Sequence, residues 1–225
     1  MSLKGRNIAV VGSNRGIGLE LVRHLIADGR SVFAFCREPS RALTNLKPTA
    51  VIENFNVTDP EVMRTQVKQL GKARLDWLIH VSGILKNENL EQLTQRSLVR
   101  QMSVNAIGPI LAVQAFLPYL AKQSKIGLLT SRLGSITENT SGSYYGYRMS
   151  KSALNMAGKS LSEDLRGRGT AVFLLHPGYV RTEMTGFNGD INASESAKGL
   201  IKLMDEKTLR ETGSFWHVTG RKIPW

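Results

Sequence analysis

Cysteine is almost absent from this sequence, which contains only one, Cys36, in 225 residues. A single cysteine excludes an intrachain disulfide, so the chain is compatible with a reducing compartment such as the cytoplasm. Long apolar runs are absent as well, because Pro109, Gln114 and Pro118 interrupt the longest one, residues 106–121. A membrane-spanning helix needs about 20 apolar residues, and a secretory signal needs a longer apolar core than the N-terminal residues offer. We therefore expect a cytoplasmic protein with no membrane partner.

Acidic residues are also few, since 18 Asp and Glu stand against 30 Lys and Arg, for a formal net charge of +12. Such a charge attracts polyanions, whether nucleic acid, an anionic membrane or a phosphorylated small molecule. The basic residues are scattered along the chain, whereas nucleic-acid-binding segments gather them in short blocks. We therefore expect a phosphate-bearing small molecule as the ligand and no nucleic-acid partner.

Short runs of β-branched and aromatic residues alternate with helical patterns along the whole chain. This alternation is typical of βαβ units, whose parallel strands are covered by helices on both faces. It predicts an α/β fold with a single doubly wound Rossmann-type domain, residues 1–225, and about seven parallel strands. The predicted strands are Asn7–Val11, Ser31–Cys36, Val51–Phe55, Leu75–Val81, Lys125–Thr130, Ala171–Leu175 and Ser214–Val218.

The predicted helices lie between these strands. The first carries an apolar stripe on Ile17, Leu21 and Leu25, which recur every four residues. Aspartate caps free helical amides and proline is tolerated at the first helical position, so a second helix is expected to begin at the Asp59-Pro60 pair. It should run to Leu70, and two longer helices are predicted over Leu98–Gln123 and Tyr147–Arg166.

A glycine-rich turn, Gly12-Ser13-Asn14-Arg15-Gly16-Ile17-Gly18, connects the first strand to the first helix. Glycines at such a turn let the backbone approach a pyrophosphate, which accepts hydrogen bonds from the helix N-terminus. A site for NAD usually has an acidic residue after the second strand, where this chain has Arg37. Guanidinium groups bind phosphate bidentately, so Arg15 and Arg37 favour NADP(H). The alternative is that both arginines are merely solvated.

Tyr147 and Lys151 are four residues apart, so they lie on the same face of their predicted helix. Such a pair suits the reduction of a carbonyl by hydride, which leaves negative charge on oxygen and needs a proton donor. Free tyrosine has a pKa near 10, and an adjacent ammonium group stabilises the phenolate. A hydroxyl that donates to the substrate oxygen would complete the site, and Ser131 and Ser135 are the candidates.

The order and approximate spacing of these motifs resemble the short-chain dehydrogenase/reductase family over nearly the whole chain. The motifs are the glycine turn, Asn105, Ser131, Tyr147-x-x-x-Lys151 and His176-Pro177-Gly178. Residues 133–136, 147–155 and 223–225 look like the sniffer and C-factor-like carbonyl reductase branch of that family. Many relatives are dimers, so the resemblance also implies a homodimer or a higher homo-oligomer.

The resemblance implies a role for each matching residue. Tyr147 would be the acid/base, Lys151 would lower its pKa and bind the nicotinamide ribose, and Ser131 would orient the carbonyl. Asn105 would hold the water of a proton relay. The expected cofactor-binding residues are Gly12, Ser13, Asn14, Arg15, Gly16, Ile17, Gly18, Arg37, Asn56, Val57, Ser82, Gly83, Tyr147, Lys151, Pro177, Gly178, Val180 and Thr182. No metal site is expected.

The chain departs from the family pattern at several positions. Ser131 and Ser135 lie on either side of the usual separation from the tyrosine, so either one could supply the substrate hydroxyl. The fourth strand ends in His80-Val81-Ser82-Gly83 where two asparagines are usual, and Val11 replaces a threonine that bonds this turn. We hypothesise an apolar contact between Val11 and Val81 instead. Asn56 replaces the usual adenine-binding aspartate and retains hydrogen-bonding capacity.

These observations together predict an NADPH-dependent oxidoreductase that reduces a small-molecule aldehyde or ketone. The segment Thr182–Ala197 is predicted to form a small, mobile, partly apolar substrate lid that accepts many carbonyls. The alternative is an NADP(H)-binding regulator without turnover, which the departures at His80 and Asn56 favour. The complete set of expected catalytic residues argues against it, because a sensor needs only the dinucleotide half.

Overall fold

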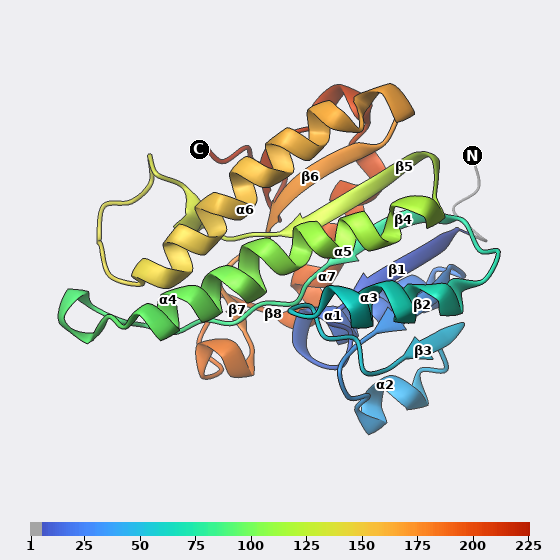
Figure 1. Ribbon diagram of the computed structural model, residues 1–225, viewed down its shortest axis with the longest axis horizontal. Helices are drawn as coiled ribbons and strands as arrows, with labels where there is room; N and C mark the ends of the chain where they lie inside the picture. Colours follow the sequence, from blue (N-terminus) through green and yellow to red (C-terminus); the bar gives the residue numbers. More distant parts are fainter. Residues whose placement is uncertain (1–5) are drawn as a thin grey trace.

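Seven parallel strands form the central sheet of the computed structural model, which describes residues 6–225. The strand order is β3-β2-β1-β4-β5-β6-β9, as in a doubly wound Rossmann fold. The predicted α/β fold with about seven strands is therefore confirmed (Figure 1). The strands are β1 (Asn7–Val11), β2 (Ser31–Phe35), β3 (Ala50–Ile52), β4 (Leu75–His80), β5 (Leu120–Leu129), β6 (Ala171–His176) and β9 (Ser214–His217).

Helices cover both faces of the sheet, with α3, α4, α5 and α6 in front of it in Figure 1 and α1 and α7 behind. Their bounds are α1 (Gly16–Ala27), α2 (Arg41–Asn45), α3 (Pro60–Gln66), α4 (Gln95–Met102), α5 (Gly108–Phe116), α6 (Tyr145–Asp164) and α7 (Ala193–Glu206). Each strand is nearly free of exposed side chains because helices shield both of its sides.

Two apolar clusters fill the space between the sheet and its helical layers. The front cluster contains an aromatic group in which the ring of Phe35 lies 5.0 Å from that of Phe55 and 4.9 Å from that of Phe116, both edge-on. Edge-to-face packing adds to the stabilisation that aromatic burial provides. The rear cluster joins α1 and α7 to the sheet through Leu21, Leu25 and neighbouring residues. These clusters fix the strand ends on which the site depends.

The predicted helix over Leu98–Gln123 is wrong at both ends and in its middle. It begins earlier, at the start of α4, passes through a π-helical turn (Ser103–Ile107) into α5, and finishes in a 3₁₀ turn, Leu117–Tyr119. Pro118 has no N–H to continue the helical pattern, and residues 120–123 join β5 instead. The whole run Gln95–Tyr119 is long and apolar enough to cross a membrane, but composition of this kind also occurs in core helices.

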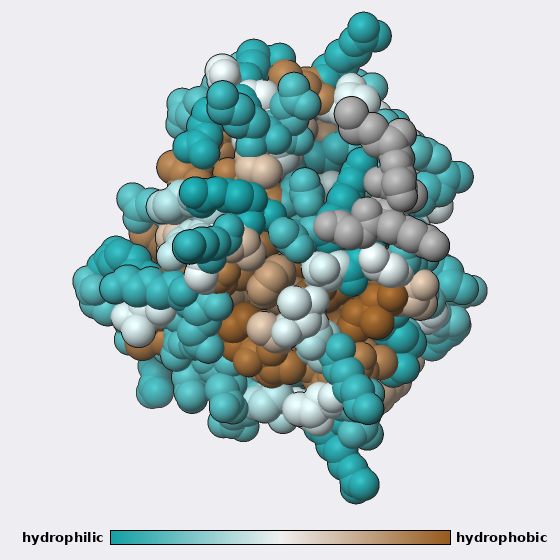
Figure 2. Space-filling view, turned by 90° about the vertical axis from the view of Figure 1, so that its right-hand side faces the viewer, coloured by the Kyte–Doolittle hydropathy of each residue, from teal (hydrophilic) through white to brown (hydrophobic). Residues whose placement is uncertain are grey.

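The two ends of the sheet differ in character. Figure 2 views the end at which the strands begin, where hydrophilic residues surround an apolar area. The opposite end, where the strands finish, carries the loops that follow β1, β4, β5 and β6. A small two-stranded sheet lies there, formed by β7 (Val180–Arg181) and β8 (Ile191–Asn192). Ligands of doubly wound sheets bind at this carboxyl end.

Candidate active site

The glycine turn gives the first helix an open N-terminus. Gly12 has φ +89°, and a Cβ on Gly18 would lie 2.0 Å from the Gly12 carbonyl oxygen, so only glycine permits this close packing of helix on strand. Arg15 occupies the N-cap position of α1 without making a side-chain cap, which leaves the first helical N–H groups available. The geometry fits an anionic ligand such as a pyrophosphate.

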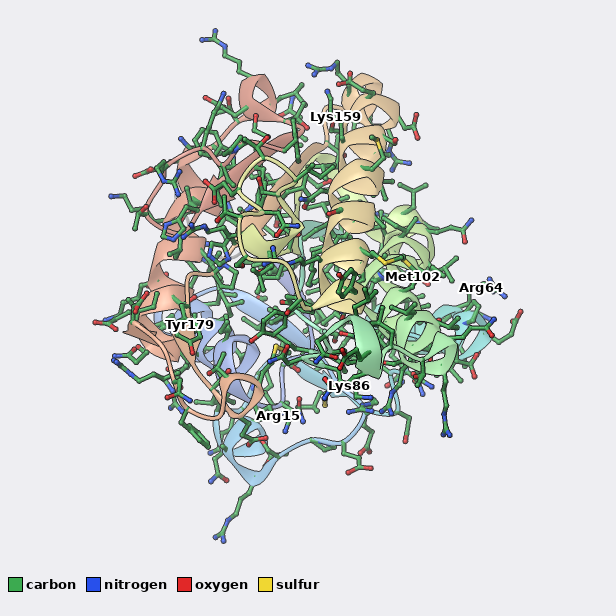
Figure 3. The ribbon with its side chains drawn as sticks, turned by 90° about the vertical axis from the view of Figure 1, so that its left-hand side faces the viewer. Arg15, Arg64, Lys86, Met102, Lys159 and Tyr179 are labelled. Atoms are coloured by element: carbon green, nitrogen blue, oxygen red, sulfur yellow. The ribbon has the colours of Figure 1, made fainter. Side chains whose placement is uncertain are left out.

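A cleft of about 720 Å³ runs from this turn across the carboxyl end of the sheet. Figure 3 looks onto this end, where Arg15, Lys86 and Tyr179 project from three separate loops. Fourteen of the expected cofactor-binding residues line the cleft, namely Gly12, Asn14, Arg15, Gly16, Ile17, Arg37, Asn56, Val57, Ser82, Gly83, Tyr147, Lys151, Pro177 and Thr182. The volume and this lining fit a dinucleotide.

Four expected cofactor residues do not line the cleft. The Ser13 hydroxyl is buried and donates to the Phe35 carbonyl, 3.1 Å away. Gly18 faces the backbone of the glycine turn, and Gly178 faces Ile191. Val180 is buried as part of the small β7–β8 sheet. These residues shape the loops that carry the site, but they do not line the cleft.

The charged residues that line the cleft are mostly cations, with Glu183 as the acidic exception. Arg37 follows β2, as expected for a residue that meets a 2′-phosphate. Arg15 forms an ion pair with Glu183, which lies in the segment after β7. Arg100 on α4 and Arg181 on β7 also line the cleft, and the sequence analysis did not single them out. No local motif marks them, because only the folded chain brings α4 and β7 to the glycine turn.

Tyr147 and Lys151 lie one helical turn apart near the start of α6, and both are buried. The Lys151 Nζ donates to the Leu129 carbonyl at 2.8 Å and lies 5.7 Å from the centre of the Tyr147 ring. Gly83 lies beside this amine, since a Cβ there would be in ordinary contact with the Nζ at 3.7 Å and closer to the Asn105 side-chain oxygen, at 3.3 Å. The predicted helical spacing thus places the phenol and the amine together at the cleft.

Burial determines the titration of both groups. It raises the pKa of Tyr147 to about 12, although the Ser131 hydroxyl acts in the opposite direction. It also lowers the pKa of Lys151 to about 8. Lys151 was expected to lower the pKa of Tyr147. In this structure desolvation of the phenolate raises that pKa instead, and the opposing effect comes from the Ser131 hydroxyl.

The two candidate serines occupy different environments. Ser131 lies at the end of β5, where its hydroxyl accepts a hydrogen bond from the Leu133 N–H and acts on the Tyr147 phenol. The Ser135 hydroxyl donates to the carbonyl oxygens of Pro224 at 2.7 Å and Trp225 at 3.2 Å, and it is 1% exposed. Ser131 therefore faces the candidate site, whereas Ser135 faces away from it.

Asn105 lies in the π-helical turn between α4 and α5, where it interrupts the helix that was predicted as continuous. Its side chain is fully buried. The amide group donates to the Ile84 carbonyl at 2.8 Å and to the Ser150 hydroxyl at 3.0 Å, and its oxygen accepts from the Ile84 N–H at 2.8 Å. The asparagine thus joins the loop after β4 to α6, directly beside Lys151.

The hypothesised contact between Val11 and Val81 is wrong. The Val11 side chain belongs to the front cluster and Val81 packs against the rear one, because successive side chains of a strand alternate between faces. The two residues are joined through their backbones instead, by a hydrogen bond of 2.8 Å from the Val81 N–H. His80 is buried, its Nε2 has no partner among the described residues, and burial lowers its pKa to about 3.

The predicted lid is shorter than expected. It begins with a 3₁₀ turn, Glu183–Thr185, and returns at β8, so residues 193–197 belong to α7. Asn192 caps that helix by accepting from the Glu195 N–H. Met184 and Phe187 of the lid line the cleft and are 44% and 68% exposed, which gives it the predicted apolar character.

A family model described as short chain dehydrogenase matches residues 6–192. The chain belongs to this family. A 1-hydroxy-2-glutathionyl-2-methyl-3-butene dehydrogenase from Rhodococcus sp. (strain AD45) is 35% identical over 224 residues, which cover 97% of this chain and 99% of that protein. C-signal from Myxococcus xanthus is 40% identical over 130 residues, which cover 57% of this chain and 78% of that protein.

Solved structures of carbonyl reductases share the whole fold. A carbonyl reductase from chicken fatty liver, solved with NADPH, has a TM-score of 0.91 and 31% identity, covering 99% of this chain and all of that one. Carbonyl reductase Sniffer of D. melanogaster has a TM-score of 0.89 and 26% identity, with the same coverage. The predicted membership of the short-chain dehydrogenase/reductase family, in its sniffer-like carbonyl reductase branch, is confirmed. The chain is an oxidoreductase of this family.

Proposed function

We propose that this short-chain dehydrogenase/reductase reduces an aldehyde or ketone to an alcohol, with NADPH as its cofactor. The observation that carries the proposal is that Tyr147 and Lys151 line one end of a cleft whose other end is the glycine turn, with the Ser131 hydroxyl beside the Tyr147 phenol. Arg37 and the paired Arg15 favour a cofactor with a 2′-phosphate, and the fatty liver reductase was solved with NADPH. An uncapped helix N-terminus suits the pyrophosphate.

NADPH, when bound, supplies the hydride that reduces the carbonyl carbon. Ser131 donates a hydrogen bond to the carbonyl oxygen and holds it next to Tyr147. Tyr147 gives its phenolic proton to that oxygen as negative charge develops there. Lys151 then stabilises the phenolate that remains, and it binds the nicotinamide ribose. Asn105 keeps α6 in register with the loop that follows β4. It would also retain the water through which the phenol recovers its proton.

The substrate range is expected to be broad. The lid presents Met184 and Phe187 to the cleft, and both are well exposed, so apolar and planar carbonyls find contact surface without a fixed pocket. We expect aldehydes, ketones and diketones to be accepted with different efficiency.

The decisive experiment is an NADPH-consumption assay over a panel of aldehydes, ketones and diketones, run in parallel with Tyr147→Phe. The proposal expects consumption by the unmodified protein and a loss of at least about a thousand-fold in the variant, since no other proton donor takes its place. NADPH binding without consumption across the panel would favour the regulator instead. Turnover that survives in Tyr147→Phe would contradict the proposed acid/base.

We further propose that the protein is a cytoplasmic homodimer. Helices α4 and α6 pack beside one another, and their outer faces expose Val99 (55%), Met149 (49%) and Met156 (69%). Side chains of this kind gain by burial against a second copy. Sedimentation equilibrium should give about twice the chain mass, and Met156→Arg should give the monomer. A monomeric unmodified protein would contradict the proposal.

A further inference from the structure

Residues 221–225 are bonded to the loop that carries Ser131. The Ser135 hydroxyl donates toward the carbonyls of Pro224 (2.7 Å) and Trp225 (3.2 Å), and the Thr137 N–H donates to the Trp225 carbonyl at 2.9 Å. The Glu138 N–H donates back to the Ser135 hydroxyl at 3.2 Å. Ser135 is buried, and its hydroxyl thus links the two segments through hydrogen bonds.

The same segment is fixed to the edge strand of the sheet. The Ile223 N–H donates to the Phe215 carbonyl of β9 at 2.9 Å, and the Ile223 side chain is 5% exposed. The ring of Trp225 stacks on that of Phe215 with 5.8 Å between centres and 22° between planes. Residues 221–225 therefore fold back along β9 and are held to it by backbone hydrogen bonds and by ring stacking.

An ion-pair network adds a third link between the two segments. The Glu138 carboxylate pairs with Arg132 at 2.6 Å and with Arg221 at 3.5 Å. The Glu138 side chain is 18% exposed, but the side chains of Arg132 and Arg221 are 60% and 56% exposed, so water screens these pairs and the hydrogen bonds are the stronger links. Arg132 follows Ser131 directly in the chain, which brings the network to the substrate-orienting hydroxyl.

On its other side the loop is packed against α6. The Gly134 N–H donates to the Ser131 carbonyl at 2.8 Å, and the Gly134 carbonyl accepts from Ser152 at 3.0 Å and Asn155 at 3.1 Å. A Cβ on Gly134 would lie 2.8 Å from the Lys151 backbone, so the contact is as close as the chain permits. The loop is held between the helix that carries Tyr147 and residues 221–225.

We infer that residues 221–225 are a brace that positions the Ser131 hydroxyl against the substrate carbonyl, with Ser135 and Trp225 as positioning residues. The inference rests on the proposed function, because Ser131 matters in this way only if a carbonyl is reduced. A hydroxyl helps a transition state only when its position is fixed before the reaction, and a small misplacement lowers the rate strongly. Without residues 221–225, the loop that carries Ser131 would lose its contacts on the side opposite α6.

The test compares Ser135→Ala and Trp225→Ala with the control Ser124→Ala. Ser124 is similarly buried, at 2% exposure, and its hydroxyl bonds Thr170 within 3.0 Å, away from residues 221–225. Turnover is normalised to the number of NADPH-binding sites, so a misfolded fraction does not count. We expect both brace variants to lose at least about ten-fold in kcat with the Kd for NADPH within about two-fold, while Ser124→Ala keeps its kcat.

Two further measurements separate positioning from general destabilisation. Trp225→Phe keeps an aromatic ring on Phe215 and should retain most of the kcat. Ser135→Ala removes the hydrogen bonds from the loop to residues 224–225, and Trp225→Ala removes the ring stacking that holds these residues on β9. Because the two links act in series on the Ser131 hydroxyl, the double variant should lose clearly less than the product of the two single losses. Unchanged kcat in both single variants, or losses that multiply, would overturn the brace. If Tyr147→Phe is fully active, the proposed function fails, whereas an inactive Tyr147→Phe beside unaffected brace variants defeats only the brace.

Discussion

At the scale of single residues, we expect the buried phenol and amine to set the pH dependence of the proposed carbonyl reduction. The pKa of Tyr147 is about 12, so its proton is present for donation at every pH of the assay. The pKa of Lys151 is about 8, so its positive charge is lost as the pH rises through that value. Because the cation stabilises the phenolate formed by proton donation, kcat/KM should be constant below about pH 7 and decline above about pH 8.

The measurement is kcat/KM for reduction of one aldehyde between pH 6 and pH 10, with NADPH saturating throughout. Thermal unfolding is recorded at each pH, so that a decline caused by unfolding is recognised. A rate that increases from pH 8 to pH 10 would show that the neutral amine is the active form and would contradict the assignment.

Arg37 should determine the preference for NADPH over NADH. Its guanidinium lines the cleft directly after β2, and a hydrogen bond to a charged group contributes about 1.5–3 kcal/mol. Arg37→Ala should therefore raise the KM for NADPH at least about ten-fold and leave the KM for NADH within about two-fold. Arg41, exposed on α2, is the matched control, and Arg41→Ala should change neither. Equal losses with both cofactors would place Arg37 away from the 2′-phosphate.

The sequence predicted those residues whose geometry is local. Tyr147 and Lys151 share a helix face because they are four residues apart, and the glycine turn follows from its place between strand and helix. Ser131 and Ser135 could not be separated in this way, because their difference arises from Pro224 and Trp225, nearly ninety residues later. The pairing of Arg15 with Glu183 was missed for the same reason.

At the scale of elements, Asn105 holds three segments in register. Its amide bonds both the N–H and the carbonyl of Ile84, and also the hydroxyl of Ser150. Asn105→Ala leaves these buried groups unpaired and should lower the free energy of unfolding by about 2 kcal/mol or more. Chemical denaturation measures the loss. Ser103→Ala, in the same π-helical turn but on its exposed side, should lose much less. A loss in Asn105→Ala that is as small as the loss in Ser103→Ala would indicate that the fold tolerates unpaired backbone groups at Ile84.

Some strands were predicted closely, as was the long helix α6, whereas β5 begins five residues before the predicted Lys125 and β3 ends three residues before the predicted Phe55. Fully buried parallel strands are short apolar runs, so β1 was predicted at both of its ends and β6 to within one residue. The run from Gln95 to Tyr119 is polar in α4 and largely apolar in α5, and nothing in its periodicity marks the π-helical turn or the point at which β5 begins. The two-residue strands β7 and β8 were missed because pairs this short leave no periodic pattern.

At the scale of the whole molecule, two buried histidines should make the fold sensitive to acid. Burial lowers the pKa of His80 and of His176 to about 3, whereas in the unfolded chain a histidine titrates near 6.5. Between these values the unfolded chain binds protons that the folded chain does not, so stability is lost as the pH falls from about 6.5 toward 3. Each histidine contributes up to about 1.4 kcal/mol per pH unit in that window.

His80→Asn tests this linkage, because asparagine retains hydrogen-bonding capacity at the strand end and cannot titrate. The free energy of unfolding is measured by denaturant titration at pH 7.5 and at pH 4.5. The difference between the two values should shrink by about 2 kcal/mol in the variant, since one of the groups that bind a proton in the unfolded chain but not in the folded chain is gone. An unchanged difference would mean that His80 accepts its proton in the folded chain as readily as in water, and that its buried Nε2 is solvated.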